Sequence, residues 1–199
     1  YKLANITTPS CGITAEIPLQ KKKGPPMTTY FAPVETDEQT HQLANMATAI
    51  WNEYWPAIIG QEQTTYMIER FQSYEPIARD MAEHHYEYWF VVADKGEATE
   101  RVVGFTGGHN EPETNRFFIS KIYLLAQERG KHFASDIIAF YNDLCLKRGF
   151  SAMYLTVNKH NELGIRAYQG KGFETIDAVE TDIGHGFIMD DFIMERRAQ

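Results

Sequence analysis

The fold of this chain is indicated by one stretch of sequence, residues 122–135, which reads Ile122-Tyr123-Leu124-Leu125-Ala126-Gln127-Glu128-Arg129-Gly130-Lys131-His132-Phe133-Ala134-Ser135. Residues 116–125 are aromatic and β-branched, which predicts a strand, and after the stretch apolar residues recur at helical spacing until Gly149. The first N–H groups of a helix lack internal partners, so this strand-to-helix junction predicts an anion site. Arg129 and Lys131 add cationic donors, while Gly130 and Ala134 keep the backbone accessible to a diphosphate. Taken alone, the junction is also typical of a solvated basic loop before an ordinary helix.

A second motif follows after one more predicted strand. Met153, Leu155 and Val157 alternate as in a strand, and residues 158–173 then read Asn-Lys-His-Asn-Glu-Leu-Gly-Ile-Arg-Ala-Tyr-Gln-Gly-Lys-Gly-Phe. Asn161 begins a short predicted helix in this segment, and the glycines of residues 170–172 close it. The two motifs therefore follow each other in the order strand, loop, helix, strand, loop, helix.

Together these segments resemble the acetyl-CoA signature of the GNAT superfamily of N-acyltransferases. The matching features are residues 122–134 and, after them, the pattern N-x-x-x-I-x-x-Y-x-x-x-G-F of residues 161–173. The resemblance spans residues 27–197, and its C-terminal part is similar to polyamine acetyltransferases. It implies an α+β fold with a mixed, mostly antiparallel central sheet, splayed between the fourth and fifth strands and flanked by helices. The pantetheine of acetyl-CoA would lie in the gap like an added strand.

The resemblance also implies roles for individual residues. Tyr168 matches the tyrosine that protonates the departing CoA thiolate as general acid, although an aromatic here is also typical of a helix packed on a core. Asn161 would orient the cofactor, and Lys171 would reach a CoA phosphate or stay solvated. The predicted cofactor-binding residues are Ile122, Tyr123 and Leu124 for pantetheine, Arg129, Gly130, Lys131, His132, Phe133, Ala134 and Ser135 for the pyrophosphate, and Asn161, Tyr168 and Lys171.

Two positions depart from the family pattern. His132 stands where the family usually has a glycine, so its side chain either crowds the diphosphate or points away while its N–H still donates. Gly164 replaces a common alanine, which should weaken the short helix by about 1 kcal/mol.

The remaining segments predict further helices and strands around these motifs. Thr36 and Gln39 have capping-box spacing at the start of an amphipathic helix, and a second helical region over residues 61–83 should break or bend near Pro76. Strands are predicted over residues 86–93, 101–107 and 116–125, with polar turns between them, and a last hairpin turns at residues 184–186. We predict a single domain over residues 27–199. Residues 1–26 are proline-rich and aperiodic, and we interpret them as an extension that is a leader, an appended segment or a mispredicted start.

Composition limits the partners that we expect. The net charge of −8 argues against nucleic acid, and no apolar run is long enough to cross a membrane, so we expect neither partner. Cys11 and Cys145 are the only cysteines, which favours a reducing, cytoplasmic location. His84 and His85 have no third ligand at suitable spacing, so we predict no metal.

The resemblance leads to a functional hypothesis: an N-acetyltransferase in which a primary amine attacks acetyl-CoA, the co-substrate, within a ternary complex. Acidity and the subgroup resemblance favour a polyamine or other small cationic amine, and an amino acid, an aminoglycoside-like molecule or a peptide N-terminus stays open. The alternative is a non-catalytic sensor or interaction module that binds acyl-CoA, and a homodimer also stays open.

The reaction also needs a base. At neutral pH an alkylamine must lose a proton at a cost of about 4.6 kcal/mol, so a base or a proton wire is expected. His109, Glu111 and Glu87 lie on or beside predicted strands, but each is also typical of an ordinary polar residue at a strand end or in a loop. Of Asp190 and Asp191, at most one faces an amine pocket, because neighbouring strand side chains alternate in direction.

Overall fold

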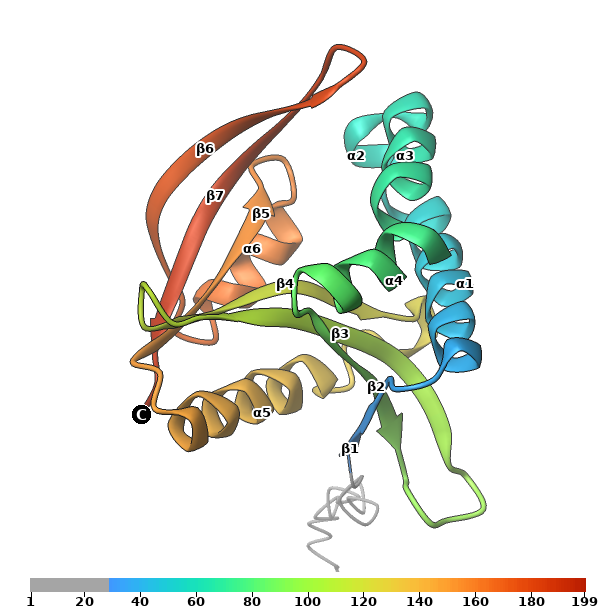
Figure 1. Cartoon of the computed structure of the whole chain (residues 1–199), viewed down its shortest axis with the longest axis vertical. Helices are drawn as coiled ribbons and strands as arrows, with labels where there is room; N and C mark the ends of the chain where they lie inside the picture. Colours follow the sequence, from blue (N-terminus) through green and yellow to red (C-terminus); the bar gives the residue numbers. More distant parts are fainter. Residues whose placement is uncertain (1–28) are drawn as a thin grey trace, which may run out of the picture.

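A computed structural model of the chain describes residues 29–199, so the predicted extension over residues 1–26 lies outside the described part. These residues form one seven-stranded sheet in the order β1-β2-β3-β4-β5-β7-β6 (Figure 1). Only β4 and β5 pair in parallel, and all other neighbours are antiparallel. The predicted α+β class with a mixed, mostly antiparallel sheet is therefore confirmed. The strands are β1 (Thr29–Pro33), β2 (Glu87–Ala93), β3 (Arg101–Glu111), β4 (Arg116–Leu124), β5 (Ala152–Asn158), β6 (Glu174–Gly184) and β7 (Phe187–Arg197).

Helices cover both faces of this sheet (Figure 1). The helix α5 packs through Phe133, Ile137 and Tyr141 against one face, whereas α1 and α4 pack on the other through residues such as Leu43 and Ile77. No helix among the described residues is long and apolar enough to cross a membrane. The helical segments are α1 (Asp37–Tyr54), α2 (Pro56–Ile59), α3 (Gln61–Met67), the π-helix η1 (Ile68–Gln72), α4 (Tyr74–Glu83), the 3-10 turn η2 (Ala126–Glu128), α5 (Phe133–Arg148) and α6 (Glu162–Gln169).

The predicted start of α1 is confirmed in atomic detail. The N–H of Gln39 donates to Oγ1 of Thr36 at 3.2 Å, and the N–H of Thr36 donates to Oε1 of Gln39 at 3.0 Å. This reciprocal capping box fixes where the chain enters the helix. As a result, the C-terminal end of α1 carries Trp51 and Tyr54 to the region where β4 and β5 separate.

Two local predictions need correction. The helical region over residues 61–83 breaks at Ser73, which is extended, rather than at Pro76. Pro76 lies in the first turn of α4, where a missing N–H breaks no helical hydrogen bond. The short strand β1 was not predicted at all, although its five residues pair with β2 over their whole length. The five-residue segment carries too little alternation to be distinguished from a loop.

The separation of β4 and β5 is the feature that positions the functional site. The two strands pair only from Arg116 to Ile119 on β4 and from Ala152 to Leu155 on β5, and beyond these residues they diverge. The register between β3 and β4 also shifts between Gly107 and Gly108, which leaves Ser120 of β4 as the extra residue of a β-bulge. The predicted splay between the fourth and fifth strands is thus confirmed.

Candidate active site

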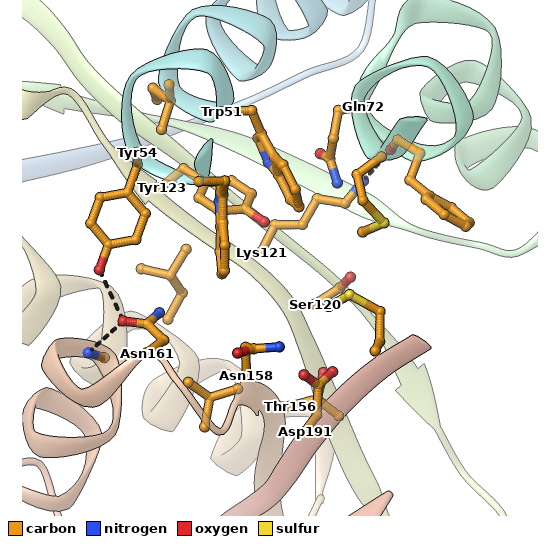
Figure 2. Close-up of a pocket in the computed structure, with 18 of the residues that line it drawn as sticks. Trp51, Tyr54, Gln72, Ser120, Lys121, Tyr123, Thr156, Asn158, Asn161 and Asp191 are labelled. Atoms are coloured by element: carbon orange, nitrogen blue, oxygen red, sulfur yellow. Dashed lines mark hydrogen bonds between the residues drawn. The ribbon is translucent and has the colours of Figure 1, made fainter. Parts of the chain in front are cut away.

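A cavity of about 570 Å³ lies between the diverging strands β4 and β5. Its walls come from β4 and β5, from the end of α1, from η1 and α6, and from β7 (Figure 2). Among the residues predicted to bind the cofactor, the cavity is lined by Ile122, Tyr123, Leu124, Arg129, Ala134, Asn161 and Tyr168. The structure therefore brings residues from three separate segments to one site.

The β4 wall of the cavity offers backbone groups to an extended ligand. Residues 121–124 pair with β3 on one side, but they have no strand partner on the side of β5. Such an edge can take up a chain that carries amides, in the way an added strand would. The Leu124 carbonyl already accepts a hydrogen bond from Nε of Arg129 at 3.1 Å. This edge fits the pantetheine arm of acetyl-CoA.

The turn before α5 offers free donors at the mouth of the cavity. Among residues 29–199, the backbone N–H groups of residues 130–134 have no acceptor in the protein. Arg129 pairs with Glu53 at 2.6 Å, but Glu53 is 49% exposed, so an anion can compete for the guanidinium at little cost. Lys131 pairs with the buried Glu128 at 3.2 Å, which anchors the turn. Free N–H groups at a helix start suit a diphosphate.

His132 adopts the backbone conformation that the family's glycine would favour. Its φ is +72°, in the left-handed region, and it is the residue immediately before α5. Its side chain makes no capping hydrogen bond and is exposed, so it does not occupy the N–H groups of the helix start. The departure from glycine therefore costs backbone strain of order 1 kcal/mol and leaves the shape of the turn intact.

Six of the predicted cofactor contacts do not line the cavity: Lys131 and His132, which are described above, and Gly130, Phe133, Ser135 and Lys171. Phe133 is buried in the core under the sheet, so a contact with the cofactor would have to run through its backbone N–H. Gly130 has a φ of +77° at the turn, Ser135 lies in the first turn of α5, and Lys171 follows α6 and is partly exposed. Their roles stay predictions.

Asn161 connects α6 to α1. Its Oδ1 accepts the N–H of Gly164 at 3.0 Å, which caps α6, and it also accepts the hydroxyl of Tyr54 at 2.9 Å (Figure 2). A Cβ on Gly164 would lie 2.7 Å from Nδ2 of Asn161. The glycine therefore makes room for this position of the Asn161 side chain.

Tyr168 presents a protonated hydroxyl to the cavity. It lines the wall formed by α6, and its hydroxyl makes no hydrogen bond to the described residues. Burial raises its pKa to about 12, and the nearby Tyr54 adds to this shift. At neutral pH the phenol keeps its proton, so it is a donor rather than a base.

Of the neighbouring carboxylates Asp190 and Asp191, the structure places Asp191 in the cavity. Asp191 lines the cavity beside Asn158, its register partner on β5, and is only 9% exposed, whereas Asp190 pairs with Lys159 and does not line the cavity. Burial raises the pKa of Asp191 to about 6, and the neighbouring Asp190 adds to the shift. One carboxylate oxygen, Oδ1, has no hydrogen-bond partner among the described residues. A buried, unpaired acceptor in a cavity is available to a ligand cation or proton.

The other candidate bases lie elsewhere. Glu87 pairs with Arg148 at 2.5 Å, and Glu111 accepts the hydroxyl of Tyr154 at 2.5 Å. The ring of His109 packs against Tyr86 and Phe118. None of the three lines the cavity.

The sequence places Trp51, Trp55 and Tyr66 near the substrate side, and the first two line the cavity whereas Tyr66 does not. The indole Nε1 atoms of both tryptophans and Oε1 of Gln72 are buried without a hydrogen-bond partner among the described residues, and Lys121 is only 5% exposed. Gln72 of η1 and Lys121 of β4 were missed by the sequence analysis, because no local motif unites them. The one available signal was a lone lysine in the apolar strand Arg116-Phe117-Phe118-Ile119-Ser120-Lys121-Ile122-Tyr123-Leu124.

Comparisons with known proteins agree with this geometry. The model of the acetyltransferase (GNAT) family matches residues 46–173, which is more than half of the chain, so the chain belongs to this family. No curated protein sequence matches it significantly.

Among solved structures, PaiA N-acetyltransferase of Thermoplasma acidophilum in complex with coenzyme A is similar, with 21% identity and a TM-score of 0.67 over 85% of this chain and 99% of that one. A GCN5-related N-acetyltransferase of Rhodopseudomonas palustris has 14% identity and a TM-score of 0.66 over 85% and 96% of the two chains. The dodecameric spermidine N-acetyltransferase of Vibrio cholerae has 16% identity and a TM-score of 0.58 over 85% and 94%. At these identities the similarity shows the fold alone. The family match and the fold together identify an acetyltransferase domain that uses acetyl-CoA.

Proposed function

We propose that this protein transfers the acetyl group of acetyl-CoA directly to a small primary amine. Acetyl-CoA, when bound, supplies the activated acetyl group. Residues 120–124 would hold its pantetheine arm, and the turn over residues 129–135 would hold its pyrophosphate. The acceptor amine would lie between Asp191 and Tyr168. The observation that carries the proposal is that one cavity contains both a free acceptor atom, Oδ1 of Asp191, and a free donor, the hydroxyl of Tyr168.

The two side chains supply the two proton transfers that aminolysis of a thioester requires. The carboxylate of Asp191, with a pKa near 6, is ionised at pH 7 and can take the proton of the acceptor ammonium. The neutral amine nitrogen then attacks the thioester carbonyl carbon and forms the new C–N bond, and the C–S bond breaks as the tetrahedral adduct collapses. Tyr168 donates its proton to the departing sulfur and is reprotonated, through solvent, by the second proton that the nitrogen loses when it becomes an amide. Asp191 releases its proton to solvent, so one turnover converts an ammonium and acetyl-CoA into an amide, CoA thiol and one free proton.

Direct attack is favoured over a covalent acyl-enzyme. Cys145, the one cysteine in the described part of the chain, is buried in the core and does not line the cavity. Burial raises its pKa to about 11, so it is a poor thiolate source at neutral pH. The amine is therefore the nucleophile that the cavity suits best.

The acceptor class is part of the proposal. Asp191 suits the ammonium of any small primary amine, and a polyamine is the acceptor favoured by the sequence. The similarity to a spermidine N-acetyltransferase shows a fold on which polyamine acetylation occurs in another protein, but it does not identify the acceptor of this one.

Release of free thiol from acetyl-CoA tests the proposal. We expect release that depends on an amine from a panel of polyamines, amino acids, aminoglycosides and short peptides, with the acetylated product identified by mass spectrometry. Binding of acetyl-CoA without release across the panel would instead support the sensor.

We also propose that the protein forms a homodimer. Strand β6 is an edge strand, and an edge strand presents unpaired backbone groups to which a second chain can pair. It exposes the apolar side chain of Ile176 as well. Sedimentation velocity would detect a dimer, and an Ile176→Lys variant should dissociate it if β6 forms the interface.

A further inference from the structure

The cavity contains a buried cation for which the proposed reaction has no use. Lys121 of β4 is 5% exposed, and its Nζ donates to the hydroxyl of Tyr88 at 2.7 Å and to the carbonyl of Phe71 at 3.4 Å. Both partners are neutral. Lys121 forms no ion pair with any carboxylate of residues 29–199, although Asp80 also lines the cavity. Burial lowers the pKa of Lys121 to about 8, and the attraction of Asp80 offsets this only in part, so the ammonium is still charged at pH 7 and would gain from an anionic partner.

The direction of Lys121 follows from the β-bulge at Ser120. Phe117 and Ile119 of β4 face the core under α5, so a regular strand would send Lys121 to the same side. The extra residue reverses the alternation, so that Ile122 packs toward that core and Lys121 faces the cavity. The fold thus places the lysine at the site through a specific irregularity of the strand.

A close contact between β2 and β3 holds the hydroxyl to which Lys121 donates. A Cβ on Gly107 would lie 2.5 Å from the ring of Tyr88, so a glycine at this position is what allows the ring to approach β3 so closely. The ring of Tyr88 is 1% exposed, and its hydroxyl is therefore fixed beside Nζ of Lys121. The ammonium is held in place, and its remaining donor capacity is available to a ligand.

The groups near Lys121 can complete a binding site for an anion. Trp51 is 2% exposed, and its indole N–H forms no well-shaped hydrogen bond among the described residues, although its proximity to the Tyr123 hydroxyl offsets part of the rise in pKa that burial causes in that phenol. Gln72 is 3% exposed and also lines the cavity, and its amide offers N–H donors beside an unpaired oxygen. Figure 2 shows Trp51, Gln72 and Lys121 on one side of the cavity and Asp191 with Asn158 on the other.

From this arrangement we infer that the acceptor is an amino-acid-like molecule, a small primary amine that also carries a carboxylate. The carboxylate would bind Lys121 and the indole N–H of Trp51, while the ammonium would face Asp191. This inference rests on the proposed function and narrows its acceptor class. A diamine or polyamine would instead bring a second ammonium toward Lys121, and like charges repel strongly in a buried site. The cavity therefore favours a zwitterion over a polycation.

The test compares matched acceptors and a charge-removing variant. The kcat/KM for thiol release is measured with ω-amino acids and α-amino acids, and with alkylamines and diamines of matched chain length. The parent protein is compared with Lys121→Met, which removes the charge at similar volume, and with Lys147→Met, a matched control at an exposed position on α5. Binding of CoA and the thermal unfolding temperature report whether each variant is folded. Calorimetry of the amino acid with the protein–CoA complex gives a readout besides turnover.

We expect the parent protein to prefer carboxylate-bearing amines, and Lys121→Met to reduce that preference by about tenfold to a hundredfold, as for the loss of a hydrogen bond to a charged group. Lys147→Met should keep the preference, and calorimetric affinity for the amino acid should fall only in Lys121→Met. Equal or better turnover of diamines, with a preference that Lys121→Met does not alter, would overturn the inference and leave the proposed function standing. Absence of turnover with every amine, despite CoA binding, would remove the proposed function itself. If Lys121→Met does not fold, Lys121→Gln and the parent's ranking of matched acceptors decide the question in the same way.

Discussion

The hydroxyl of Tyr54, the last residue of α1, donates a 2.9 Å hydrogen bond to Oδ1 of Asn161, the residue that caps α6. The bond joins the helical layer on one face of the sheet to the helix that follows the splayed strand β5. The guanidinium of Arg129 lies 4.9 Å from the ring centre of Tyr54, so the same tyrosine also contacts the predicted pyrophosphate turn. Tyr54 therefore links three elements around the mouth of the cavity.

Replacement of Tyr54 by phenylalanine removes this bond while retaining the ring. We expect Tyr54→Phe to lower the free energy of unfolding by about 1 kcal/mol, the usual net contribution of such a hydrogen bond. Chemical denaturation measures the change, with Tyr30→Phe as the control because the Tyr30 side chain is 37% exposed. Equal stabilities of the two variants would show that the link contributes nothing.

Gly164 gives a prediction that differs from the expectation based on helix propensity. Alanine in a short helix should add about 1 kcal/mol of stability. However, its Cβ would lie 2.7 Å from Nδ2 of Asn161, so the Asn161 side chain would have to move. We expect Gly164→Ala to give no net gain in stability and to weaken binding of acetyl-CoA severalfold, as measured by calorimetry. A stabilised variant with unchanged affinity would mean that the position of Asn161 is not important for the cofactor.

The raised pKa of Asp191 predicts a pH profile. If Asp191 accepts the proton of a bound ammonium, kcat/KM should rise with pH to about 6 and then stay level until about pH 8, where Lys121 loses its charge. If the protein instead binds only free neutral amine, kcat/KM should keep rising toward the amine pKa, near 10. Asp191→Asn should abolish the rise near pH 6 and lower the rate, and initial rates between pH 5 and 9 distinguish these cases.

The same carboxylate should reduce stability at neutral pH. Its pKa is about 6 in the folded protein against an ordinary value of 3.8, so the folded state holds this proton more tightly. Between those two pH values the folded state binds more protons than the unfolded state, and stability must fall as the pH rises. We expect Asp191→Asn to be more stable than the parent at pH 7.5 and to gain less at pH 4. An equal gain at both values would contradict the assigned shift.

Removal of the Tyr168 hydroxyl should affect chemistry more than binding. We expect Tyr168→Phe to lower kcat about a hundredfold or more, which is the usual contribution of a general acid, with little change in the affinity for CoA. Steady-state kinetics and CoA binding measure the two effects separately. A normal kcat in this variant would assign the protonation of the thiolate to solvent.

The cofactor half of the site could be predicted because its residues are close in sequence. Ile122, Tyr123 and Leu124 lie just before the turn, and Asn161 and Tyr168 lie on one short helix, so a motif records their spacing. The structure places these five residues around the cavity. The splay could be predicted for the same reason, since the resemblance covers both strands that diverge.

The acceptor half could not be predicted in this way. Lys121, Gln72 and Asp191 come from three distant segments, and only the tertiary fold brings them to one cavity. The direction of Lys121 depends on the bulge at Ser120, which reverses the alternation of a regular strand and leaves no mark in the apolar pattern. The choice between Asp190 and Asp191 likewise required the register of β5 and β7.

Two-substrate initial-rate kinetics test the central claim most directly, because that claim places acetyl-CoA and the amine in one cavity at the same time. Rates are measured with acetyl-CoA and the best acceptor varied together. Direct transfer predicts intersecting double-reciprocal lines and no release of CoA in the absence of amine. Parallel lines, with an acetylated protein detected by mass spectrometry, would contradict direct transfer, because they are the pattern of a covalent intermediate.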